Sequence, residues 1–80
     1  MTKVYQVFSE IGDEIFYRVF ASAEEAEKKF DEEFEKLKQI ISPLDLHEQI
    51  PMDFDDMGGI KGYTDSKFEN QVKLNWFKVY

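Results

Sequence analysis

Two runs of β-branched and aromatic residues, residues 3–9 and residues 14–21, flank a short polar turn near the start of the chain. The second run divides by alternation into two sets, Ile15, Tyr17, Val19 and Ala21 in one and Phe16, Arg18 and Phe20 in the other. This period of two places the sets on opposite faces of a strand. The turn contains Gly12-Asp13, which tight turns favour, so the chain predicts a β-hairpin.

A capped amphipathic helix is predicted to follow the hairpin. Ser22 and Glu25 have the spacing of a capping box. Behind them an apolar residue recurs at every third or fourth position, which is the period of one helix face. These apolar residues are Ala26, Phe30, Phe34, Leu37 and Ile41. We expect the helix to end near Ile41, because Ser42 precedes a proline and therefore disfavours helical backbone.

The segment after this helix is predicted to hold a second, short helix and a loop. Ser42 and Pro43 fit the N-cap and first position of a helix, which we expect to reach about Gln49 and to stop before Pro51. Residues 51–59 have the composition of a loop.

Extended structure resumes at Ile60, and the final run places Val72, Leu74 and Trp76 on one face. We therefore expect residues 1–80 to form a single small domain of the α+β class. Its predicted architecture is a two-layer ββα(α)ββ fold, with a four-stranded, mostly antiparallel sheet packed on one face by the amphipathic helix.

Composition excludes several classes of function. The chain has 17 acidic and 10 basic residues, a net charge of −7, which argues against direct binding of a nucleic-acid backbone. It has no cysteine for a disulfide, a thiolate metal site or a cysteine nucleophile. No apolar run approaches the roughly 20 residues of a membrane helix, and the first residues do not have the apolar stretch and small-residue cleavage site typical of a signal peptide. We expect a cytoplasmic protein without a membrane partner, located in the host cytoplasm if it is encoded by a phage.

The negative charge is concentrated in the middle of the chain. Residues 10–56 hold 15 acids against 5 bases, a net charge of −10. Within the predicted helix Glu27, Asp31 and Glu35 repeat at every fourth position, with Lys38 as the single neighbouring cation along this row. This row is either an ordinary solvated face or a negative strip that meets a basic partner.

No lysine or arginine occurs between Lys38 and Lys61, although five acids do: Asp45, Glu48, Asp53, Asp55 and Asp56. Apolar residues such as Phe54 are interleaved with them. Acids beside large apolar side chains suggest an interaction surface. The alternative is that the apolar residues hold a loop against the core.

The sequence contains no clear motif for a catalytic site or a metal site. Residues 53–58 begin like a calcium loop, but an EF-hand also needs oxygen ligands where this chain has Met57 and Thr64. His47 is the one histidine, and no nucleophile signature accompanies it. We predict no enzyme activity, no catalytic residue, no metal site and no cofactor. We expect most aromatic residues to pack the core, and any on the uncovered sheet face to mark a protein contact.

In size, acidity and fold outline the chain is similar to the small phage-encoded inhibitors of nucleases and of CRISPR systems. That resemblance implies an acidic, non-enzymatic inhibitor that acts as a DNA mimic and engages a basic, nucleic-acid-binding surface of a partner protein. The predicted contact residues are Glu27, Asp31, Glu35, Asp45, Glu48, Asp53, Phe54, Asp55 and Asp56. We expect a monomer or a homodimer. The alternative function is a self-associating or structural interaction domain that uses an exposed sheet face or a C-terminal edge strand.

Overall fold

The computed structural model describes residues 2–53 and 58–79, and within them it contains five strands, one α-helix and one turn of 3-10 helix. In chain order the elements are β1 (Thr2–Ile11), β2 (Glu14–Phe20), α1 (Ala23–Ile40), η1 (Pro43–Asp45), β3 (His47–Asp53), β4 (Gly58–Thr64) and β5 (Gln71–Val79). The predicted α+β class, with one helix packed on one face of an antiparallel sheet, is confirmed. Within the described residues, no helix is both long and apolar enough to cross a membrane.

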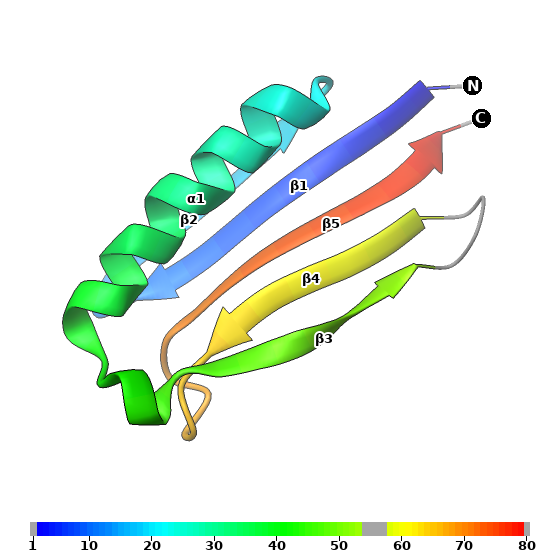
Figure 1. Ribbon diagram of the computed structural model, residues 1–80. Helices are drawn as coiled ribbons and strands as arrows, with labels where there is room; N and C mark the ends of the chain where they lie inside the picture. The colour runs from blue at the N-terminus through cyan, green and yellow to red at the C-terminus, as the bar shows by residue number, and fades with distance from the viewer. Residues whose placement is uncertain (1, 54–57, 80) are drawn as a thin grey trace.

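All neighbouring strands are antiparallel, and their order is β2-β1-β5-β4-β3 (Figure 1). The first and last strands of the chain therefore lie side by side in the interior of the sheet, and β2 and β3 form its two edges. Two sequence predictions are wrong here. The sheet has five strands in the described residues, where four were expected, and the C-terminal strand is not an edge strand, because β5 pairs with both β1 and β4.

The predicted hairpin and helix are confirmed. β1 pairs with β2 in unbroken register from Tyr5–Phe20 to Ile11–Glu14, around the two-residue turn at Gly12. The Ser22 side chain accepts a hydrogen bond from the Glu25 backbone N–H at 3.4 Å, so the helix has its expected N-cap.

β3 replaces the predicted second helix and part of the predicted loop. Ser42 does cap η1, but helical structure ends at Asp45, and the next residues form a strand paired with β4. Pairing with the next strand of the chain, β4, decided this conformation, which the propensity of the segment alone could not reveal. Pro51 fits because β3 is an edge strand whose register shifts between Gln49 and Met52.

The core lies between α1 and the strands β2, β1 and β5, over which the helix runs (Figure 1). Its buried apolar residues are Val7, Phe20, Ala26, Phe30, Leu37, Val72 and Leu74. Phe34 stacks on Tyr63 of β4 with ring centroids 3.9 Å apart, which extends this packing toward the β3 edge. The opposite face of the sheet, called the open face below, carries no helix from the described residues.

Candidate interaction surfaces

The acidic row predicted on the helix is exposed but largely compensated. Glu27, Asp31 and Glu35 are all exposed on α1. Lys61 of β4 places its Nζ 2.7 Å from Glu27 Oε2, and Lys38 places its Nζ 2.7 Å from Glu35 Oε1. Within the described part of the chain, Asp31 is the member of this row without an ion pair. The row is therefore a weaker negative strip than its sequence suggests.

Lys61 reaches the helix because of its position in the sheet. It pairs with the buried Leu74 of β5, so its side chain points to the helix side of β4. Its Nζ lies 4.9 Å from the centre of the Phe30 ring, a cation–π contact. This lysine is 34 residues from Glu27 in the chain, so the helical pattern alone could not predict the pair.

The strand β3, which falls within the interval without lysine or arginine, forms a free edge of the sheet. We call η1 and β3, with Asp45, Glu48 and Asp53, the acidic edge. Glu48 is exposed in β3, opposite Tyr63 of β4. Asp45 has a structural contact, because its carboxylate accepts a hydrogen bond from the Ser66 backbone N–H at 3.2 Å.

The remaining predicted contact residues are only partly described. Asp53 is the last residue of β3 and pairs with Gly59. Phe54, Asp55 and Asp56 lie outside the described residues, as does most of the segment compared with a calcium loop. Within residues 2–53 and 58–79, no group of three or more histidine, aspartate or glutamate side chains is placed to hold a metal ion.

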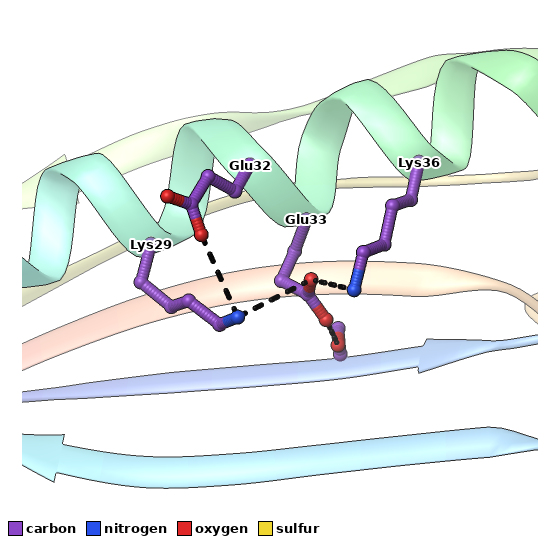
Figure 2. Close-up of polar contacts among 5 residues, drawn as sticks. Lys29, Glu32, Glu33 and Lys36 are labelled. Carbon is purple, nitrogen blue, oxygen red and sulfur yellow. Dashed lines mark hydrogen bonds and ion pairs between the residues drawn. The ribbon is translucent and has the colours of Figure 1, made fainter.

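A buried carboxylate, Glu33, was not predicted. Its side chain points from α1 toward the sheet and is 3% exposed, and its Oε1 accepts a 2.6 Å hydrogen bond from the Ser9 hydroxyl of β1 (Figure 2). Lys36 Nζ lies 2.8 Å and Lys29 Nζ 3.8 Å from Oε2 of the same carboxylate. The signal was present in the sequence, since Glu33 stands three residues after Phe30 and four before Leu37, within the apolar stripe.

This cluster is a structural link. Burial alone would raise the pKa of Glu33, but the contacts with Lys36, Ser9 and Lys29 together hold that pKa below its ordinary value of 4.5. Glu33 therefore stays ionised at neutral pH. Ser9 is 2% exposed, so a substrate has no access to either group.

The open face carries most of the exposed large apolar side chains. On β2 these are Ile15, Tyr17 and Val19, with exposed fractions of 68%, 58% and 48%. Met52 of β3 and Phe77 of β5 are also exposed there, as their pairing with Ile60 and Val4 indicates. Phe16 and Phe20 lie on the helix side of β2, so the aromatic residues divide between the core and the open face.

A cavity of about 400 Å³ lies where β4 turns into β5. His47, Lys73 and Phe68 are among its lining residues, and the Phe68 side chain is 71% exposed. Lining serine and threonine hydroxyls come from Ser66 and Thr64, but Thr64 Oγ1 is bonded to backbone carbonyls of the turn. Among the described residues, His47 makes no hydrogen bond with either hydroxyl, so this structure shows no nucleophile activated by the histidine in this cavity.

No protein-family model, curated protein or solved structure matches this chain.

Proposed function

We propose that this protein is a small non-enzymatic binding protein whose acidic edge engages a basic surface of a partner protein. One observation carries the proposal. The strand β3, within the interval without lysine or arginine, is a free edge of the sheet, while the two lysines that bound the interval, Lys38 and Lys61, are each held 2.7 Å from an acid of α1. The acidic edge therefore gains no neutralisation from either of them.

The shape of this edge favours contact through side chains. Pro51 lacks a backbone N–H, and the register shift beside it breaks the regular spacing of an edge strand. A partner strand would therefore meet few consecutive free N–H and C=O groups along β3. An exposed carboxylate such as that of Glu48 instead presents negative charge to a groove lined by lysine and arginine, including one that ordinarily holds nucleic acid.

The direct test uses a fluorescent decalysine peptide as a basic probe and anisotropy as the readout. Glu48→Lys changes the charge by two units on the acidic edge. Asp13→Lys makes the same change in the exposed β1–β2 turn, whose strands are separated from β3 by β5 and β4, and is the matched control. We expect Glu48→Lys to weaken binding about tenfold, or about 1.4 kcal/mol, and the control to weaken it much less.

Salt and DNA provide two further readouts. Binding of the wild-type chain should weaken as salt rises, since exposed charges are screened. A basic nucleic-acid-binding protein that binds the immobilised chain should be displaced by duplex DNA. Equal losses in the two variants, or binding that is insensitive to salt, would contradict the proposal.

A further inference from the structure

The two edges of the sheet differ in how they are protected against strand pairing. β3 carries Pro51 and a register shift, which are common devices that blunt an edge. β2 has neither: it contains no proline or glycine, and its register with β1 is unbroken over all seven residues. Its charged residues are Glu14 and Arg18. β2 is thus a regular edge strand with little to prevent another strand from joining it.

The backbone groups that β2 leaves free can be identified from the register. Ile11 and Glu14 close a two-residue turn and form a hydrogen-bonded pair, and such pairs alternate with non-bonded pairs along an antiparallel ladder. The N–H and C=O groups of Ile15, Tyr17 and Val19 therefore point away from β1. These same residues place exposed apolar side chains on the open face.

We propose that β2 pairs antiparallel with β2 of a second copy of this chain, around a two-fold axis at Tyr17. In that register Tyr17 faces Tyr17 of the other copy, and Ile15 faces Val19. All three residues with outward backbone groups are then paired on both chains. The result is one continuous sheet that runs through both molecules, with an acidic edge at each far end.

The sequence of β2 is complementary to itself in this register. On the open face every pair is apolar, and aromatic and β-branched cross-strand pairs stabilise sheets. On the helix side Arg18 faces Phe16 of the other copy, and Glu14 is the neighbour of Phe16 on the same face of that strand. No two like charges stand directly opposite. A shift that pairs Tyr17 with Val19 would instead place the two Arg18 side chains opposite each other.

Disulfide cross-linking tests the register in the full chain, which has no native cysteine. In a hydrogen-bonded antiparallel pair the Cα atoms lie about 5.5 Å apart, within the range that a disulfide spans. Tyr17→Cys should therefore form a covalent dimer under mild oxidation. Ile15→Cys alone should not, because the two copies of residue 15 lie about 13 Å apart along the strands. A mixture of Ile15→Cys and Val19→Cys should cross-link as a heterodimer.

Sedimentation velocity tests the dimer without a cross-link. The wild-type chain should sediment as a dimer whose fraction rises with concentration, and Tyr17→Lys should sediment as a 9.5 kDa monomer. Met52→Lys is the matched control, since it places the same charge at an exposed apolar position of the open face on the other edge. That control should remain dimeric.

Three outcomes would overturn the inference. These are a wild-type monomer at millimolar concentration, a dimer that Met52→Lys disrupts and Tyr17→Lys does not, and cross-linking that is equal for all single cysteines. Circular dichroism of each variant shows whether it is folded. If Tyr17→Lys fails to fold, the cross-linking of the cysteine variants still tests the proposed pairing. Charge reversal at Glu48 leaves the dimer intact, so this test and the decalysine test can fail independently.

Discussion

The Ser9 hydroxyl donates a 2.6 Å hydrogen bond to the Glu33 carboxylate, and this bond joins the middle of α1 to β1 (Figure 2). Both residues are almost fully buried, at 2% and 3% exposure. A charged group at this depth is tolerated because it has polar partners, the Ser9 hydroxyl and the ammonium groups of Lys29 and Lys36. The helix is therefore positioned on the sheet by a polar contact as well as by apolar packing.

Removal of one partner of this hydrogen bond should lower the free energy of unfolding more than replacement of both partners. Ser9→Ala leaves the carboxylate without its buried donor, and we expect it to lower the free energy of unfolding by about 2 kcal/mol. The double variant Ser9→Ala/Glu33→Leu removes both polar groups. Its loss of stability should be smaller than the sum of the losses in the single variants Ser9→Ala and Glu33→Leu. Urea denaturation of the four proteins measures this coupling. Strictly additive losses would show that the two residues act independently.

Stability should fall as the pH drops into the acid range. Contacts with their partners hold the pKa of Glu33 below its ordinary value of 4.5, although burial acts in the opposite direction. In the same way, bonds from Asn70 and from backbone N–H groups outweigh burial at Asp65 and keep its pKa below the ordinary value of 3.8. The stabilisation that the ionised Glu33 and Asp65 contribute is complete at pH values above these ordinary pKa values. Below them the unfolded chain takes up protons first, and stability is lost as the pH falls through the folded-state pKa values.

Urea denaturation between pH 7 and pH 3 measures this dependence. Glu33→Gln cannot titrate at this position, so its stability should decline less over the same interval than that of the wild type. Identical pH profiles for the two proteins would mean that Glu33 titrates with the same pKa in the folded and unfolded chain.

The side chain of Trp76 in β5 leaves no room for a side chain at Gly59 of the neighbouring strand β4. A Cβ added at Gly59 would overlap the indole, which lies across the glycine. Gly59→Ala should therefore displace the ring and cost about 2 kcal/mol. Trp76 is the one tryptophan in the chain, so its fluorescence reports the displacement directly.

Gly12→Ala is the comparison for this change. A Cβ there meets nothing within 4 Å, and the expected cost of about 1 kcal/mol comes from its φ of +61°. The tryptophan spectrum should be unchanged in this variant. An unaltered spectrum in Gly59→Ala would refute the packing described for Trp76.

Phe68→Gly should stabilise the protein. Phe68 has a φ of 58°, a left-handed conformation that suits glycine, and its side chain is 71% exposed, so little burial offsets the strain. We expect a gain of about 0.5–1 kcal/mol in the free energy of unfolding, seen as a higher Tm. Phe68→Ala retains the Cβ and the strain, and should give no such gain. If both variants destabilise the turn equally, the phenyl ring contributes packing that its exposure does not show.

The elements predicted correctly are those with a local pattern. The capping box at Ser22, the apolar stripe through Phe30 and Leu37 and the alternation through β2 each describe one segment and its period. The sequence predicts a helix to about Gln49 and a loop from Pro51, where the structure has β3, because Pro51 marks the end of a helix as readily as an edge strand. Only pairing with β4, a later segment, distinguishes the two.

By itself, the sequence determined the hairpin, the capped helix and the two-layer α+β class, because residue period and end signals act over a few neighbouring positions. The tertiary structure decided which strands are edges, which face of β2 remains open and which acids are neutralised. Lys61 compensates Glu27 and Glu33 lies above Ser9 because the sheet brings distant segments together. Such contacts depend on strand order and register, for which no single segment carries a signal.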